Sequence, residues 1–275
     1  MSLKTRAIPS LTTITGIRGF ALLALGLWLL GSCAPQNGNR ELTVAVAANM
    51  QFAMAELAEA FTQSSGIPCH VTLSSSGKLA AQIREGAPYD VFVSADMAYP
   101  EALYGEGFSN NPPKIYAYGK LVLWTLRDSI EPNLEQLLQS NTSHIALANP
   151  ETAPYGAAAR EVLEGLGIWE AMSEKWVYGE SIAQVNQFVY SGAAEMGFTA
   201  MAAVQSHQTR GMGRWKEVPQ DRYSPIAQGA ILLNGPAASQ PSGQVFFDYL
   251  FSDSAAAILM KFGYEIPKKP ATAIH

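Results

Sequence analysis

From residue 41 onward the chain alternates short apolar segments with amphipathic segments, and this alternation restricts the possible folds more than any other feature. Residues 42–47, 71–73 and 91–93 are apolar runs of strand length. Between the first two, residues 50–61 repeat apolar side chains at helical spacing, and Gly66 follows as a stop signal. Strands that alternate with helices in this way predict a parallel sheet covered by helices on both faces.

A second series of the same kind begins after Gly119. Strands are expected at residues 121–124, 145–148 and 195–199, and helices at residues 134–138, 156–166 and 182–189. The stretch 211–224 is rich in glycine and charge and is expected to be a loop that returns to the first series. There, residues 227–233 are expected to form a strand and residues 245–262 a helix.

These patterns predict an α/β chain with two lobes of similar size, joined by two crossings. The first lobe is expected to comprise residues 41–119 plus 225–275, and the second lobe residues 120–224. In sheets of this kind, ligands bind beyond the carboxyl ends of the parallel strands, where helix N-termini converge. The cleft between the lobes is therefore the expected binding site.

Residues 1–32 are predicted to be a lipoprotein signal peptide. The apolar run 20–30 is eleven residues long, which suits a signal-peptide core and is too short to span a bilayer. Leu30-Gly31-Ser32-Cys33 resembles the bacterial lipoprotein cleavage box, so Cys33 is the expected lipidation site; ordinary cleavage beside an incidental cysteine is the alternative. Residues 33–40 would then be a flexible tether. The mature protein is expected to be exported, in the periplasm or on the cell surface, and anchored to the membrane by lipid.

Composition and charge narrow the function classes. Hydrophobic residues make up 48% of the chain and charged residues 15%, which predicts a well-packed globular protein. The net charge of −5 argues against nucleic acid as a partner, because nucleic-acid binding needs a basic surface. With Cys33 lipidated, Cys69 has no disulfide partner and is expected to be a buried small hydrophobe. An acidic protein that binds an anion must do so through local geometry.

The run Ser74-Ser75-Ser76-Gly77-Lys78-Leu79 is the clearest local candidate for such a site. It follows a predicted strand and opens a predicted helix, so it gathers hydroxyl groups, free backbone N–H groups and the positive end of a helix dipole. For one such turn, an ordinary serine cap is the alternative interpretation. Asn49, Ala95 and Tyr155 also lie between a strand and a helix. Four such turns aimed at one crevice favour a shared anion site.

Six short motifs follow one another between residues 41 and 266. They are Ala47-Ala48-Asn49-Met50, the serine turn at 75–79, Gly-Ala-Pro-Tyr-Asp-Val-Phe-Val-Ser-Ala-Asp at 86–96, Pro-Glu-Thr-Ala-Pro-Tyr-Gly at 150–156, Gly179-Glu180-Ser181-Ile182 and Phe246-Phe247-Asp248-Tyr249-Leu250. In these motifs the chain resembles the periplasmic molybdate-binding proteins of ABC importers. The resemblance implies a type II periplasmic-binding-protein-like fold, molybdate or tungstate as the transported ligand, a transporter permease as the partner, a monomer and no cofactor.

The resemblance also implies which residues hold the oxyanion. Matched motif by motif, they are Asn49, Ser76, Ala95, Tyr155 and Ile182. Ala95 and Ile182 would act only through their backbone N–H groups, and Ser75 is the alternative to Ser76. The chain departs from the family in having Asn49 where many members have serine, and Ala200 where some members supply a tyrosine hydroxyl. Tyr155 is expected to restore that hydroxyl from a different turn.

The chemistry of the ligand suits a site made of donors. Molybdate and tungstate are fully ionised at neutral pH, so their oxygens only accept hydrogen bonds, and fixed dipoles can bind them without lysine or arginine. Lys78 is therefore expected to be a solvated charge. Phosphate keeps a proton and would need an acceptor, and the nearby candidate, Asp96, is better placed as a helix cap. Sulfate or a phosphonate stays open as the ligand, because sulfate differs from molybdate in size and not in shape.

An enzyme on the same fold is the remote alternative. The chain has four histidines, and its sequence shows no nucleophile elbow, no metal-spaced His/Cys cluster and no phosphate-binding loop. We therefore expect a binding protein with no catalytic residues, whose site holds the oxyanion without direct metal ligands.

Overall fold

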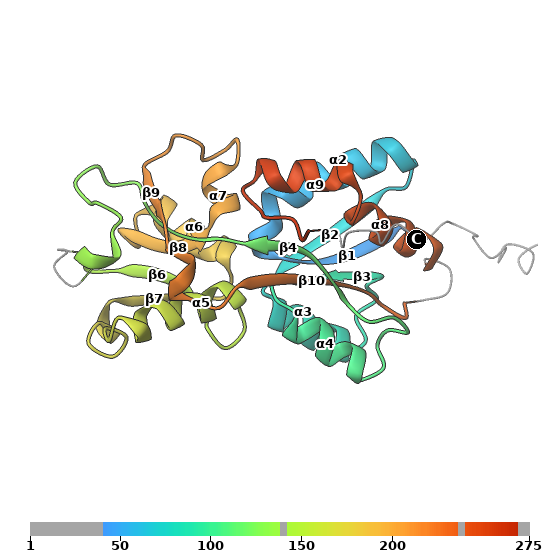
Figure 1. The fold of residues 1–275 in the computed structure, drawn as a ribbon, viewed down its shortest axis with the longest axis horizontal. Coiled ribbons are helices and arrows are strands. Elements are labelled where there is room, and N and C mark those ends of the chain that lie inside the picture. Colours follow the sequence, from blue (N-terminus) through green and yellow to red (C-terminus); the bar gives the residue numbers. More distant parts are fainter. Residues whose placement is uncertain (1–40, 138–141, 236–239, 269–275) are drawn as a thin grey trace, which may run out of the picture. The chain divides into compact units, whose positions relative to one another are not determined.

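Two five-stranded sheets form the framework of the chain (Figure 1). The computed structural model describes residues 41–137, 142–235 and 240–268. The predicted signal peptide (1–32), the tether (33–40) and the lipidation site Cys33 lie outside the described residues. Within the described ranges, no helix combines the length and the apolar character needed to cross a membrane.

The first sheet draws its strands from both ends of the described chain. They are β1 (Leu42–Ala47), β2 (Cys69–Ser74), β3 (Val91–Val93), β4 (Lys114–Gly119) and β10 (Ile226–Leu232), in the order β2-β1-β3-β10-β4. β1 pairs in parallel with β2 and β3, whereas β10 is antiparallel to both β3 and β4. All strands but β10 therefore run in the same direction.

The second sheet repeats this pattern with the intervening part of the chain. Its strands are β5 (Leu121–Thr125), β6 (Ile145–Ala148), β7 (Trp176–Gly179), β8 (Met196–Ala200) and β9 (Arg214–Glu217), in the order β7-β6-β8-β5-β9. β6 is parallel to β7 and β8, and β5 is antiparallel to β8 and β9. The predicted α/β fold with two mainly parallel sheets is confirmed. Below, lobe 1 and lobe 2 denote the elements that pack on the first and the second sheet.

Helices cover both faces of each sheet (Figure 1). In lobe 1 they are α2 (Gln51–Ser65), α8 (Gln240–Leu250) and α9 (Asp253–Lys261) on one face, and α3 (Ser76–Arg84) and α4 (Ala98–Gly105) on the other. In lobe 2 they are α5 (Pro154–Gly165), α6 (Ile182–Ser191) and α7 (Met201–Gln205). Single 3-10 turns occur in both lobes, at η1 (Ala48–Met50), η2 (Leu134–Gln136), η3 (Ser173–Lys175) and η4 (Gln220–Arg222).

Alternation of side chains along the strands builds the core. In β1, Leu42, Val44 and Val46 join the apolar cluster under α2, α8 and α9, whereas Ala45 joins the cluster under α3 and α4. The predicted helical face at 50–61 is buried as expected, and the helix ends at Gly66, whose φ of 71° lies in the left-handed region that glycine adopts without strain. These contacts hold the carboxyl ends of β1, β2 and β3 at one edge of the sheet.

Several elements of the structure differ from the sequence-based expectations. Residues 245–262 form two helices and not one, because the Ser252 hydroxyl accepts the N–H of Ala255 at 3.2 Å and starts α9 afresh. The predicted loop at 211–224 contains the edge strand β9, which pairs with β5. Strands β4 and β7 and the short helix α7 were not predicted, and the helix expected at 134–138 is only the 3-10 turn η2 within its described part.

Candidate functional site

A small cavity lies beyond the carboxyl ends of strands from both sheets. Its empty volume, including its opening to solvent, is about 200 Å³, and it is lined by Ala47, Ala48, Asn49, Ser75, Ser76, Ala95, Ala153, Pro154, Tyr155, Ser181 and Ile182. All five residues predicted to hold the ligand belong to this lining, so the structure brings them together from five turns. Their contact with a ligand stays a prediction. Ala200, where some family members supply a hydroxyl, is not part of the lining.

The cavity lining contains no charged side chain among the described residues. Asp96, the one carboxylate that the sequence places nearby, is turned to local partners. It accepts hydrogen bonds from the Ser94 hydroxyl at 3.0 Å and from the backbone N–H of Tyr99 at 3.3 Å. It thus bonds the first turn of α4 from one residue before the N-cap position, which is Met97 and not Asp96 as expected. Burial raises the pKa of Asp96. The lining therefore offers hydroxyl and backbone groups and no ionised acceptor.

The two serines at the start of α3 differ in their bonding. Ser76 is fully buried, and its Oγ accepts the backbone N–H of Ala95 at 3.0 Å. This bond leaves the hydroxyl proton of Ser76 for another acceptor and occupies the Ala95 N–H. The Oγ of Ser75 is buried and has no hydrogen-bond partner among the described residues. Ser75, the alternative in the sequence analysis, is thus a second hydroxyl available to a ligand.

Asn49 does not cap α2, which corrects the sequence-based expectation. Helix α2 begins at Gln51 after the 3-10 turn η1, and its N-cap position is Met50. The Asn49 side chain is buried, and its Nδ2 donates to Gln228 Oε1 at 2.9 Å and to Tyr264 Oη at 3.2 Å. Both amide protons are used by these bonds, while Oδ1 has no partner among the described residues. Any donor that Asn49 offers to an anion is therefore its backbone N–H.

Tyr155 carries a lobe 2 hydroxyl into a lobe 1 network. Its side chain is buried at the start of α5, and its Oη accepts a hydrogen bond from Gln228 Nε2 of β10 at 3.1 Å. Gly119 makes room for this contact, because a Cβ there would lie 2.0 Å from the Tyr155 Oη. Burial raises the pKa of Tyr155 well above its ordinary value. The hydroxyl stays protonated at neutral pH.

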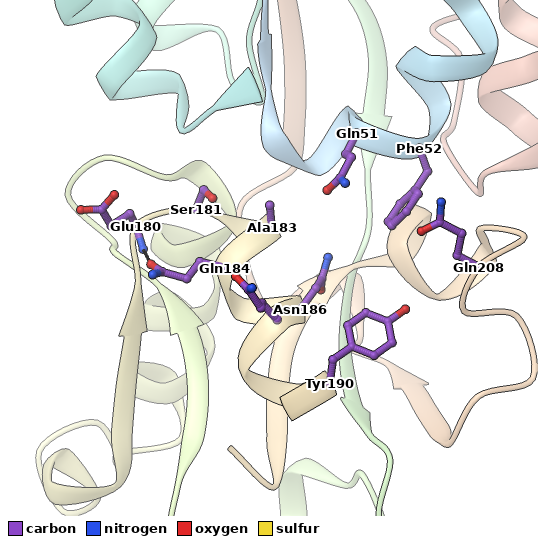
Figure 2. Close-up of a pocket in the computed structure, with 10 residues that line it drawn as sticks. Gln51, Phe52, Glu180, Ser181, Ala183, Gln184, Asn186, Tyr190 and Gln208 are labelled. Carbon is purple, nitrogen blue, oxygen red and sulfur yellow. Dashed lines mark hydrogen bonds between the residues drawn. The ribbon is translucent and has the colours of Figure 1, made fainter. Parts of the chain in front are cut away.

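Helix α6 contributes its N-terminus to the cavity. Ser181 and Gln184 have the spacing of a capping box, but neither bond of the box forms: Gln184 Oε1 accepts the N–H of Glu180 at 2.6 Å instead of that of Ser181, and the Ser181 hydroxyl makes no cap bond. The first N–H groups of a helix have no partner within it, so Ile182 can offer its N–H as predicted. A wider groove of about 990 Å³, including its open mouth, adjoins this end of α6 and shares Ser181 with the cavity (Figure 2).

Three contacts join the lobes at the rim of the cavity. The N–H of Gly77 donates to the carbonyl of Thr152 at 2.9 Å, and the Tyr99 hydroxyl donates to the carbonyl of Glu151 at 3.1 Å. The Lys78 ammonium lies 2.5 Å from the Glu180 carboxylate. Lys78 is a solvated charge as expected, and it also forms an exposed ion pair with the other lobe that the sequence did not predict.

Gly77 permits the close approach of α3 to lobe 2. A Cβ at this position would lie 2.6 Å from the Tyr99 Oη and 3.1 Å from the Thr152 Cα. Both distances are shorter than ordinary carbon contacts, and the second involves backbone that cannot rotate away. The glycine after Ser76 is therefore required by packing across the rim.

Sequence reasoning missed Gln228, its partner Tyr116, and Tyr264, which bonds to Asn49. Gln228 is fully buried, and its Oε1 also accepts the Tyr116 hydroxyl at 2.7 Å. The Tyr264 hydroxyl donates to the Asn49 carbonyl at 3.1 Å. A signal was present, since Gln228 is the one polar side chain within the apolar strand 226–232. A buried glutamine needs partners, and Asn49, Tyr116 and Tyr155 supply them.

No group of three or more His, Cys, Asp or Glu side chains that could hold a metal ion occurs in the part of the chain that the structure describes. Cys69 is partly buried against the apolar core of lobe 1 and not fully buried as expected. Desolvation raises the pKa of its thiol to about 12, with a smaller contribution from Asp90, which disfavours the reactive thiolate.

Comparison with known proteins agrees with this architecture. Residues 42–265 match the model of the bacterial extracellular solute-binding protein family. The molybdate-binding protein ModA of Azotobacter vinelandii is 40% identical over 245 residues, which are 88% of this chain and 96% of that protein. ModA of Rhodobacter capsulatus is 37% identical over 225 residues, 82% of this chain and 88% of that protein. The solved periplasmic molybdate-binding protein of Azotobacter vinelandii aligns with a TM-score of 0.79 and 35% identity, covering 83% of this chain and all of that one (100%). The chain belongs to the bacterial extracellular solute-binding protein family.

Proposed function

We propose that this protein captures molybdate, and tungstate with it, outside the cytoplasm and delivers the oxyanion to the permease of an ABC transporter. One observation carries the proposal: a cavity lined by both lobes offers hydroxyl and backbone N–H donors and no charged side chain. The names of the relatives at 40% and 37% identity, both molybdate-binding proteins, support the same ligand.

The donor set suits a tetrahedral dianion. A hydrogen bond to a charged partner contributes about 1.5–3 kcal/mol, so five to seven such bonds (roughly the number of donors at hand) are enough for sub-micromolar binding after the cost of association. The proposed donors are the hydroxyls of Ser76 and Tyr155 and the backbone N–H groups of Asn49 and Ile182. Ser75 joins them because its buried hydroxyl has no partner among the described residues. The backbone N–H of Ala95 donates to the Ser76 oxygen, so Ala95 contributes to the site by holding the Ser76 hydroxyl in place.

Sulfate or a phosphonate is the second candidate for the ligand, since a smaller tetrahedral anion could use the same donors. Thermal unfolding with molybdate, tungstate, sulfate and phosphate separates the candidates, because a ligand that binds the folded state raises the midpoint. We expect large shifts for molybdate and tungstate and small shifts for the other two. Equal stabilisation by sulfate would contradict molybdate specificity, and no stabilisation by any oxyanion would contradict the proposed function.

We further propose that the protein has no catalytic activity and needs no cofactor. The hydroxyls of the cavity lining have no histidine or carboxylate beside them in that lining that could act as a base. The test is incubation with phosphate and sulfate esters, from which we expect no release of inorganic anion.

The lobe boundaries, the anchor and the monomeric state complete the proposal. Lobe 1 would comprise residues 41–119 plus 225–275, and lobe 2 residues 120–224.

Acylation of Cys33 would hold the protein at the membrane. Cys33→Ser should therefore move the protein to the soluble fraction, and mass spectrometry of the mature N-terminus should detect the lipid in the wild type. Light scattering should give the mass of one chain.

A further inference from the structure

Gln228 lies at the centre of a buried network that reaches the cavity from lobe 1. Its side-chain amide is fully buried on β10 and has three neighbours: Oε1 accepts from Asn49 Nδ2 at 2.9 Å and from the Tyr116 hydroxyl at 2.7 Å, and Nε2 donates to the Tyr155 hydroxyl oxygen at 3.1 Å. Gln228 is not part of the cavity lining, whereas Asn49 and Tyr155 are. It therefore acts behind the lining.

The two ends of the amide are not interchangeable in this arrangement. Oε1 can only accept and faces two donors, and Nε2 can only donate and faces Tyr155. A phenol has one proton, and the Tyr155 oxygen receives the proton of Gln228, so the proton of Tyr155 must point elsewhere. Among the described residues, the Tyr155 hydroxyl donates to no protein acceptor, and the residue lines the cavity.

We propose that Gln228 is a positioning residue that turns the hydroxyl proton of Tyr155 into the cavity and so makes Tyr155 an obligate donor to the bound oxyanion. The inference rests on the proposed function, since it needs an anion in the cavity. Because Gln228 belongs to lobe 1 and Tyr155 to lobe 2, the donor is oriented only when the lobes are together. Closure thereby completes the site as well as enclosing it.

The same arrangement affects the choice between ligands. A tyrosine hydroxyl that is free to rotate could accept a hydrogen bond from a singly protonated oxyanion such as hydrogen phosphate. With its oxygen held by Gln228, it presents a proton instead, which favours a ligand whose oxygens only accept. Loss of Gln228 should therefore reduce the preference for molybdate over phosphate as well as the affinity for molybdate.

The first test is a double-mutant cycle measured by titration calorimetry with molybdate. We expect Gln228→Met, which keeps the volume and removes the amide, to weaken molybdate binding at least about fivefold and to narrow the ratio of molybdate to phosphate affinity. In the Tyr155→Phe background, the same substitution should change the affinity less than about twofold, because the proton it orients is already absent. Equal losses in both backgrounds would overturn the proposal.

Tyr116→Phe is the matched control for general damage to the network. It removes the contacts of the Tyr116 hydroxyl with the Gln228 Oε1 and with the Ser94 carbonyl, and it leaves the bond between Gln228 Nε2 and Tyr155 intact. We expect it to leave the ratio of molybdate to phosphate affinity unchanged. A change in that ratio as large as that of Gln228→Met would show that the network supports the fold and does not orient Tyr155.

A second variant keeps the test decisive if Gln228→Met fails to fold. In Gln228→Glu, an ionised carboxylate would accept the Tyr155 proton and weaken binding, whereas the protonated carboxyl would donate to Tyr155 and accept from Asn49, as the amide does. Affinity should therefore recover as pH falls from about 8.5 to about 5.5, over which wild-type affinity should stay flat.

The neighbouring titratable groups do not mask this recovery. Tyr116 and Tyr155 face Gln228, Tyr264 lies one step further, and burial raises the pKa values of all three tyrosines. Asp96 interacts with Tyr116, and it is present in the wild type and in Gln228→Glu alike. Recovery that persists in the Tyr155→Phe background would reveal charge repulsion alone and overturn the proposal. Wild-type protein that binds none of the four oxyanions would instead overturn the proposed function.

Discussion

The hydroxyl oxygen of Ser76 accepts the backbone N–H of Ala95 at 3.0 Å, so two residues that lie in different turns of the cavity are bonded to each other. The contact holds the start of α3 against the turn after β3. It also divides the roles within the serine run: Ser76 is held by a protein partner, and Ser75 has a buried hydroxyl without one among the described residues.

Single alanine substitutions should separate these two serines. Ser76→Ala leaves the buried N–H of Ala95 without an acceptor, so the free energy of unfolding of the ligand-free protein should fall by about 1–3 kcal/mol, and molybdate should bind more weakly. Ser75→Ala removes a hydroxyl that has no protein partner, so stability should be unchanged or slightly higher while binding weakens by about 1.5–3 kcal/mol. Urea unfolding and calorimetric titration measure the two effects. Wild-type affinity in Ser75→Ala would place Ser75 outside the ligand's contacts.

Gly77→Ala should impair binding by keeping the lobes apart. The added Cβ would lie 3.1 Å from the Thr152 Cα and 2.6 Å from the Tyr99 Oη, so the rim contacts between the lobes would be strained. We expect at least about tenfold weaker molybdate binding, which corresponds to about 1.4 kcal/mol. The control is Gly105→Ala, where an added Cβ would meet nothing within 4 Å. If Gly77→Ala binds as tightly as Gly105→Ala, the rim is not a determinant of closure.

The ion pair between Lys78 and Glu180 should contribute little to affinity despite its short distance. Both side chains are exposed, at 42% and 70%, and solvent and salt screen such pairs to about 0–1 kcal/mol. Lys78→Met and Glu180→Gln should each weaken molybdate binding less than about fivefold, and the difference from wild type should shrink in about 0.5 M salt. A loss above about twentyfold in Lys78→Met that persists in high salt would instead indicate that Lys78 contacts the ligand.

Stability should fall at alkaline pH because buried neutral groups must ionise on unfolding. Burial raises the pKa of Cys69 from 9.0 to about 12 and raises the pKa values of Tyr116, Tyr155 and Tyr264. Between the ordinary and the raised values the folded state binds more protons than the unfolded state, so this stability is fully present below about pH 8.5 and lost as pH rises toward the raised values. Urea unfolding at stepwise higher pH measures the loss.

Cys69→Ala provides the control for that pH series. The variant should lose stability later in the series than wild type, because only the tyrosines, with ordinary pKa values near about 10, remain to be ionised. Identical pH profiles for the two proteins would show that Cys69 is not protected in the folded state.

Local sequence patterns determined most of the secondary structure and the location of the site. The apolar repeat at 50–61 specified a buried helix face, and the turns at Asn49, Ser76, Ala95 and Tyr155 could be placed at strand ends because a strand–helix unit puts its turn at the carboxyl edge of a parallel sheet. Where the pattern depended on a partner, prediction failed: β4 and β9 are strands because β10 and β5 pair with them, and no period within residues 114–119 or 214–217 carries that information.

Only the tertiary structure decided how the polar groups of the site are divided among partners. The sequence predicted donors at the cavity, but not that Ser76 holds Ala95, that both protons of the Asn49 amide are used within lobe 1, or that Lys78 pairs across the rim. These assignments depend on contacts between residues up to 215 positions apart, as between Asn49 and Tyr264. A hydrogen bond is set by distance and angle in the folded chain, and such geometry exists only after the two sheets have assembled.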